Sequence, residues 1–196
     1  SPVNGFINAH AIAVDEDDAV FGVGEVSLED WRWAVDINLW GVIYGCHSFV
    51  PRMRAAGGGY ILNVASAAGL LSAPMMAPYN VTKAGVVALS ETLHAELKRE
   101  RIHVTALCPT FFRSQIHTQT RAPTKLSDTT TRLVTGARWS AEAIAEVALA
   151  GLERNDLYVV PQIDGKLMWR LKRLVAGRFH GVLSLAQHPA IKRKIG

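Results

Sequence analysis

The stretch SAPMMAPYNVTKAG, from Ser72 to Gly85, places Tyr79 and Lys83 four positions apart at the start of a predicted helix. Residues at this spacing lie on one helical face, so the ammonium group of Lys83 is close enough to act on the phenol of Tyr79. A free phenol has a pKa of about 10, and a nearby cation stabilises its deprotonated form. The pair therefore predicts proton transfer at neutral pH.

The rest of the chain alternates between predicted strands and helices. Short apolar runs that do not alternate with polar residues predict strands buried on both faces. These runs are VNGFINA from Val3, YILNVAS from Tyr60, IHVTALC from Ile102 and LYVVP from Leu157. Helical periodicity covers Leu28 to Arg54, Tyr79 to Glu100 and Ser140 to Arg154, with Ser27 and Ser140 as N-caps. This alternation predicts an α/β fold with a parallel sheet.

Candidate functional residues follow the carboxyl ends of these strands, where open parallel sheets bind ligands. The segments concerned are Asn8 to Ala11, Ser66 to Gly69 and Pro109 to Ser114. Ser66 is placed to hydrogen-bond the same reacting oxygen as Tyr79. Asn38 is unusual because it lies deep in a predicted apolar helix, where asparagine competes for backbone hydrogen bonds. We therefore expect Asn38 to have a specific task.

Asn38, Ser66, Tyr79 and Lys83 occur in this order, and YNVTK is a Y-x-x-x-K motif. With these residues the chain, from about Val3 to Pro161, resembles the short-chain dehydrogenase/reductase family, whose catalytic tetrad is Asn, Ser, Tyr and Lys at such spacings. The resemblance implies a doubly wound, Rossmann-like parallel sheet with helices on both faces. It also implies a nicotinamide cofactor, NAD or NADP, and hydride transfer to or from a substrate.

The resemblance also implies a role for each residue of the tetrad. Tyr79 would be the general acid/base, and Lys83 would lower its pKa and hold the ribose hydroxyls of the cofactor. Ser66 would polarise the substrate oxygen, and Asn38 would keep a water beside Lys83. Each residue has a structural alternative: Ser66 as a helix cap, Tyr79 as a surface aromatic, Lys83 as a solvated charge and Asn38 as a structural amide.

The resemblance also implies cofactor contacts at two segments, although some residues there differ from the family pattern. Asn8 and Ala9 occupy the start of a turn where the family has N-N-A-G, and His10 and Ala11 replace its last residues. Pro109 is retained after the third strand, and Ser114 takes the place of a threonine that holds the nicotinamide carboxamide. We expect Asn8, Ala9, Pro109 and Ser114, together with Tyr79 and Lys83, to contact the cofactor.

The Gly-rich turn that holds the cofactor's pyrophosphate in this family has no counterpart in the sequence. By analogy we expect about 80 residues ahead of Ser1, which makes the chain part of a longer polypeptide. The alternative is a shortened protein, which could not hold a dinucleotide in the usual way and would need partner subunits to shield its sheet. A separate alternative, which the missing turn favours and the intact tetrad disfavours, is a non-catalytic scaffold for oligomerisation or lipid binding.

The residues around Ser66 and Tyr79 predict an apolar substrate pocket. Its expected members are Ala67, Ala68, Met75, Met76, Phe111 and Phe112, of which one phenylalanine has core packing as its alternative. Such a wall suits a hydrophobic secondary alcohol or ketone. The extended relatives that epimerise or dehydrate nucleotide sugars share Y-x-x-x-K and form the second enzymatic alternative. We expect the polar stretch Arg121 to Thr135 to form a mobile loop over the site.

Residues 1–163 form the predicted catalytic part, and 164–196 form a basic amphipathic segment. Its side bearing Trp169 and the leucines, with Leu167, Leu171, Leu174 and Val175 in one row, is predicted to pack, as a lid or a subunit contact, with the basic side in solvent. Contact with an anionic membrane is the less favoured alternative. The resemblance implies a homodimer or homotetramer. The two cysteines predict buried thiols in a reducing, cytoplasmic setting, and we expect no metal site and no nucleic-acid partner.

Overall fold

The structure is a computed structural model that describes residues 5–8, 24, 26–114 and 131–186. Within these residues a four-stranded parallel sheet has the order β1-β2-β3-β4. The strands are β1 (Gly5–Asn8), β2 (Gly59–Val64), β3 (Ile102–Leu107) and β4 (Tyr158–Val159). Each strand pairs in parallel with the strand before it in sequence. The predicted parallel α/β fold is confirmed, and each of the four apolar runs contains a strand.

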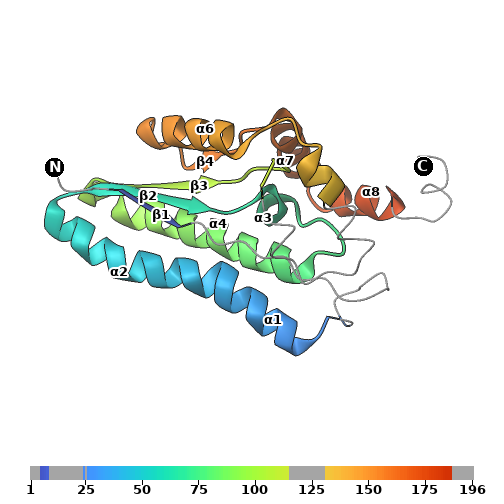
Figure 1. Ribbon diagram of the computed structural model, residues 1–196, viewed down its shortest axis with the longest axis horizontal. Helices are drawn as coiled ribbons and strands as arrows, with labels where there is room; N and C mark the ends of the chain where they lie inside the picture. Colours follow the sequence, from blue (N-terminus) through green and yellow to red (C-terminus); the bar gives the residue numbers. More distant parts are fainter. Residues whose placement is uncertain (1–4, 9–23, 25, 115–130, 187–196) are drawn as a thin grey trace.

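Helices cover both faces of this sheet, as Figure 1 shows. One face carries α1 (Leu28–Val35), α2 (Gly41–Ala56) and α4 (Ala77–Leu97), and the other carries α6 (Ala141–Glu153). Beyond the carboxyl ends of the strands lie α3 (Ala67–Leu71), α7 (Ile163–Val175) and α8 (Arg178–Ala186). No helix of the described residues is both long and apolar enough to cross a membrane.

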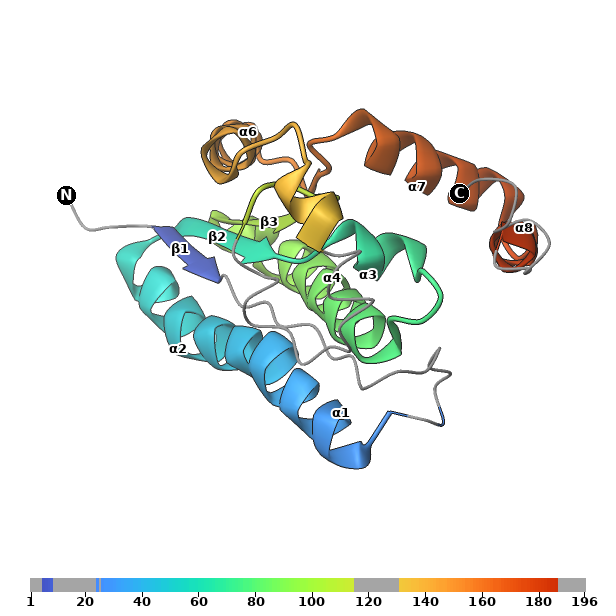
Figure 2. The same ribbon diagram turned by 45° about the vertical axis from the view of Figure 1, so that its right-hand side comes forward.

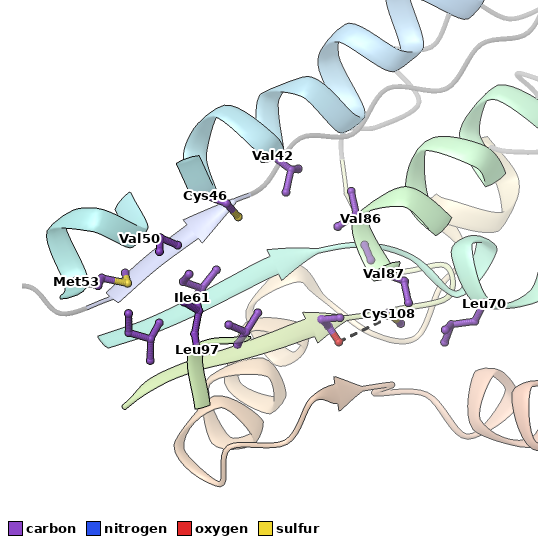
Figure 3. Packing of buried hydrophobic residues seen from close by; sticks show 14 of the residues in the cluster. Val42, Cys46, Val50, Met53, Ile61, Leu70, Val86, Val87, Leu97 and Cys108 are labelled. Atoms are coloured by element: carbon purple, nitrogen blue, oxygen red, sulfur yellow. Dashed lines mark hydrogen bonds between the residues drawn. The ribbon is translucent and has the colours of Figure 1, made fainter. Parts of the chain in front are cut away.

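The hydrophobic core has two parts, one on each face of the sheet. The larger part fills the space between the sheet and helices α2 and α4, and Figure 3 shows its packing. It includes Val42, Cys46, Val50, Met53, Ile61, Val86, Val104 and Cys108. The smaller part lies under α6 and contains Leu62, Leu107, Ile144, Ala148 and Val159. Both cysteines are buried free thiols, as predicted.

The predicted N-caps are confirmed by hydrogen bonds. Ser27 Oγ accepts from the backbone N–H of Asp30 at 3.0 Å. Ser140 Oγ accepts from that of Ala143 at 3.2 Å. At the other end of α2, Gly57 has a φ of 80° and forms the left-handed cap that lets the chain turn into β2.

Several boundaries differ from the sequence-based expectation. The predicted helix from Leu28 to Arg54 contains a π-helical turn, η1 (Asp36–Trp40), which a 3.6-residue pattern does not reveal. Helix α4 begins at Ala77, since proline is tolerated in a first turn, and continues into the 3₁₀ turn η2 (Lys98–Glu100). Of the predicted loop, 131–135 is helical, and 121–130 lies outside the described residues.

The packing of α7 agrees with the expectation in part: Trp169 packs, whereas Leu167, Leu171 and Leu174 are exposed in the single chain. The predicted subunit contact through these leucines stays a prediction. The face that packs carries buried Gly165 and half-buried Trp169, whose ring contacts the core. The leucine pattern was correctly helical, but the bulky indole and the small glycine determine which face fits the molecule.

Buried side-chain amides form a hydrogen-bond network that connects β1 and β2 to the helices α2 and α4. Asn63 on β2 donates to Ser90 Oγ on α4 at 3.0 Å and accepts from Asn8 Nδ2 on β1 at 3.3 Å. Asn8 Nδ2 also donates to the carbonyl of Val42 on α2 at 3.0 Å. Because buried polar groups are costly when unpaired, these bonds fix the register of both helices against the sheet.

Replacing Asn63 should therefore destabilise the fold. Asn63→Ala leaves polar groups of Asn8 and Ser90 without their partner and should lower the free energy of unfolding by about 3 kcal/mol. Ser90→Ala removes the outermost member of this hydrogen-bond network and should lower the free energy of unfolding by about 1 kcal/mol. Exposed Ser48→Ala is the control, expected within about 0.5 kcal/mol of the parent. Equal urea midpoints for all three variants would contradict a stabilising network.

Candidate active site

Tyr79 and Lys83 lie on one face of the first turns of α4, as the spacing predicts. The Nζ atom of Lys83 lies over the Tyr79 ring, 5.8 Å from the ring centroid. Lys83 has no solvent exposure, and its Nζ donates to the carbonyl oxygen of Val64 at 3.0 Å. The structural alternative for Lys83, a solvated helix charge, is therefore wrong. Tyr79 as a whole residue is half-buried.

Burial changes the pKa of both side chains. Desolvation lowers the pKa of Lys83 to about 8. Desolvation also raises the pKa of Tyr79, which a hydrogen bond to the Ser66 side chain counteracts. The ammonium of Lys83 lies over the Tyr79 ring, and burial is the larger effect on the pKa of Tyr79. The lowering of that pKa by Lys83 stays a prediction.

Ser66 is placed by the end of β2 and the start of α3. Its backbone is extended, and its Oγ accepts from the N–H of Ala68 at 3.1 Å as the N-cap of α3. A hydroxyl that accepts one bond keeps its own hydrogen to donate. Ser66 therefore serves as the helix cap and also pairs with the Tyr79 side chain, so the two interpretations of this serine are compatible.

Asn38 lies in the π-helical turn η1 and is fully buried. Its Nδ2 donates to Thr82 Oγ1 at 3.3 Å, and Thr82 Oγ1 donates to the carbonyl of Tyr79 at 2.9 Å. Asn38 therefore contacts α4 between Tyr79 and Lys83. π-Helical turns occur often at functional sites because they re-aim a side chain. Thr82 was missed from the sequence, although it lies inside the YNVTK motif.

The approach of α3 to α4 depends on Gly69. A Cβ atom at this position would lie 2.6 Å from the backbone carbon and oxygen of Lys83. Backbone atoms in the middle of a helix have little freedom to move, so only glycine fits. The short helix that Ser66 caps is thereby held directly against the helix that carries Tyr79.

The expected cofactor residues differ in how deeply the structure buries them. Ser114 is half-buried just beyond the segment after β3, and the carbonyl of Pro109 accepts from Ala67 N–H at 2.9 Å. The Asn8 side chain is buried and bonded to Val42 and Asn63, and its contact with the cofactor stays a prediction. Ala9 lies outside the described residues.

The expected apolar wall is only partly present at the site. Ala67 is buried, and Ala68, Met75 and Met76 are half-buried along α3 and the segment that joins it to α4. Phe111 is exposed, whereas Phe112 packs against the smaller core cluster under α6. Phe112 is therefore a core residue, in agreement with the alternative for one of the two phenylalanines.

Gln162 and Lys172 bind the segments that follow β3 and β2 and were missed from the sequence. Gln162 is buried; its Oε1 accepts from Thr110 N–H at 3.0 Å and its Nε2 donates to the carbonyl of Phe111 at 3.3 Å. Lys172 on α7 donates to the carbonyl of Leu70 on α3 at 2.7 Å. A glutamine directly after an apolar strand was the available signal for the first. Nothing distinguished Lys172 from its basic neighbours.

Comparisons with known proteins show which family this chain resembles. A family model described as short chain dehydrogenase matches residues 1–125. C alpha-dehydrogenase of Sphingobium sp. (strain NBRC 103272 / SYK-6) is 30% identical over 182 residues, which covers 78% of this chain and 60% of that protein. Cyclohexanol dehydrogenase of Acinetobacter sp. (strain SE19) is 36% identical over 92 residues, which covers 47% of this chain and 37% of that protein.

A solved structure shows the same architecture. A short chain dehydrogenase/reductase from Burkholderia phymatum, crystallised in complex with NAD, superposes with a TM-score of 0.79 at 26% identity. The match covers 87% of this chain and 65% of the other. This chain thus spans less than two thirds of the length of these relatives.

Substituting Gly69 should disturb the site through the backbone. The Cβ atom of Gly69→Ala collides with Lys83 main-chain atoms, so α3 must move and carry Ser66 with it. We expect a loss of about 1–3 kcal/mol in the free energy of unfolding, measured with urea. The matched control is Gly181→Ala on α8, where the added methyl group meets no atom within 4 Å. Equal stability of the two variants would contradict the close packing.

Proposed function

Because the chain belongs to the short-chain dehydrogenase family, we propose that it is an oxidoreductase that transfers a hydride between NAD or NADP and a hydrophobic secondary alcohol or ketone. The observation that carries the proposal is the placement of Lys83 over the Tyr79 ring, with Ser66 bonded to the same tyrosine. This arrangement gives the Tyr79 side chain a hydrogen-bonding partner in Ser66 and a charged neighbour in Lys83.

The donors at this site fit the nicotinamide end of such a cofactor. Tyr79, Lys83 and Ser114 offer hydroxyl and ammonium groups near the carboxyl ends of β2 and β3, where open α/β sheets bind nucleotides. When bound, the cofactor would supply or accept the hydride. Among the described residues no Gly-rich turn joins a strand to a helix, so the donors identified here concern the nicotinamide end alone.

The residues then divide the proton chemistry between them. Tyr79 donates its phenolic proton to the carbonyl oxygen in reduction and takes the hydroxyl proton in oxidation. Ser66 donates a hydrogen bond to the same substrate oxygen, and Lys83 stabilises the phenolate while it is charged. Asn38 holds Thr82, and through it the first turn of α4, so that Tyr79 keeps its orientation.

The substrate class follows from the apolar surroundings. Ala68, Met75, Met76 and exposed Phe111 border the site with carbon and sulfur atoms, which favour an apolar ligand. Cyclohexanol, named for the Acinetobacter relative, is a secondary alcohol of this kind.

We further propose that the protein forms a homodimer or homotetramer in a reducing, cytoplasmic setting. Trp40 and Tyr44 are exposed as a stacked pair at the start of α2, and Val81 is exposed on α4. Exposed aromatic residues grouped on one surface are typical of protein contacts. The buried free thiols of Cys46 and Cys108 are compatible with a reducing compartment.

Removing one oxygen atom tests the proposed acid/base. Tyr79→Phe keeps the ring beneath Lys83 but has no proton to exchange, so kcat should fall about 10²- to 10⁴-fold. Activity is followed as the absorbance of the reduced cofactor with cyclohexanol or cyclohexanone, and cofactor affinity by fluorescence titration. Tyr60→Phe, at an exposed tyrosine of β2, is the control and should keep full activity. Unchanged turnover in Tyr79→Phe would refute the assignment.

The role of Lys83 predicts a specific pH dependence. Below about pH 8 Lys83 is charged and stabilises the phenolate that accepts a proton in alcohol oxidation. Lys83→Met should therefore be slower by about tenfold or more in this range. Above about pH 8 the native lysine loses its charge, so the ratio of native to variant kcat should decrease.

The matched control is Lys98→Met, at an exposed lysine in η2. Its kcat should follow the native pH profile throughout. A ratio of native to Lys83→Met kcat that stays constant from acid to alkaline pH would show that the charge of Lys83 does not act on Tyr79.

A further inference from the structure

The C-terminal helices present an apolar stripe to solvent. Ile163, Leu167, Leu171 and Leu174 recur at three- and four-residue intervals and so lie along one face of α7. Leu174 is 83% exposed and Leu167 56%. These four side chains are called the apolar stripe below, and Val182 on α8 is exposed as well. Single exposed leucines are common on protein surfaces, but an aligned row is not.

The apolar stripe is separate from the face that attaches α7 to the protein. Gly165, Trp169 and Lys172 face inward: Gly165 is buried, Trp169 contacts the larger core, and Lys172 bonds to Leu70. Figure 2 shows α7 running outward above α3 to α8 at the rim of the molecule. The described part of the chain therefore leaves the apolar stripe uncovered.

Basic residues accompany the apolar stripe along the same helix. Lys166, Arg170 and Arg173 are exposed at three- and four-residue spacing, which places them in a row beside it. Arg178 adds a charge at the start of α8. From Ile163 to Ala186 the sequence contains one acidic residue, Asp164. The exposed surface of these helices thus combines aliphatic side chains with positive charge.

We propose that α7 and α8 bind the surface of an anionic phospholipid membrane, with the apolar stripe at the level of the acyl chains and the basic row at the phosphates. A helix that has an aliphatic face and a basic face, and that is too short to span a bilayer, is suited to lie in the membrane–water interface. Two copies of this chain would bring like charges together if their stripes met, which disfavours a self-contact. The stripe lies on a projecting helix, whose shape suits a soft lipid surface.

Co-sedimentation with vesicles tests the proposal. The purified protein should bind vesicles that contain phosphatidylserine in phosphatidylcholine, and not vesicles of phosphatidylcholine alone. Binding should weaken as salt is added, because the electrostatic part is screened. Absence of binding to the anionic vesicles, or equal binding to both kinds, would overturn the proposal.

Paired variants separate the two contributions. Leu167→Ser with Leu171→Ser should lower vesicle affinity about 100-fold, because two leucines no longer enter the acyl region. The control is Leu149→Ser, an exposed leucine of α6 at 47% exposure, which should bind normally. Lys166→Gln with Arg170→Gln should lower affinity about 30-fold, while Lys98→Gln with Arg99→Gln should not.

Other occupants of the apolar stripe have their own results. Binding to soluble polyglutamate without binding to vesicles would assign these helices to an acidic protein and overturn the membrane proposal. A smaller particle size of the leucine variant in gel filtration, without vesicle binding by the parent, would assign the stripe to a contact between copies. Because every substituted side chain is exposed, native far-ultraviolet circular dichroism should be retained, so lost binding reports on the surface.

Discussion

The bond from the buried Lys83 Nζ to the carbonyl of Val64 is the interaction on which the site depends. A buried ammonium group is costly, and it persists only where polar partners and packing hold it. This bond joins α4 to the end of β2, the strand that leads directly into Ser66. One contact therefore sets Tyr79 and Ser66 opposite each other, and burial makes the charge of Lys83 sensitive to pH near 8.

Close backbone packing and buried amides support this arrangement from both sides. Gly69 lets α3 touch the backbone of Lys83, and Asn38 holds Thr82 from the opposite direction. Deeper in the molecule, Asn8, Asn63 and Ser90 connect the sheet to α2 and α4. The tyrosine is thus positioned by contacts from three elements, and preorganisation of this kind favours catalysis by proximity.

The sequence predicted the α/β fold and the shared helical face of Tyr79 and Lys83, because periodicity and spacing are local properties. It could not predict the direction of the Asn8 amide or the core position of Phe112, since both depend on contacts with distant elements. The contacts of Gln162 and Lys172 were not predicted for the same reason, because their partners lie far away in sequence. The exposure of the α7 leucines could not be predicted, because an amphipathic pattern indicates that a helix has two faces without saying which one its own chain covers.

The π-helical turn at Asp36–Trp40 has a consequence for the whole helical run from α1 to α2. Buried positions along α1 and α2 recur every four residues, at Asp30, Ala34, Asn38, Val42, Cys46 and Val50. A regular helix drifts by about 40° over each such step, and the wider turn compensates for part of that rotation. Asp36–Trp40 therefore keeps the buried residues of α1 and α2 on the same side of the helical run. Deleting a single residue there would rotate α1 by about 100° relative to α2 and turn Asp30 and Ala34 away from the interior.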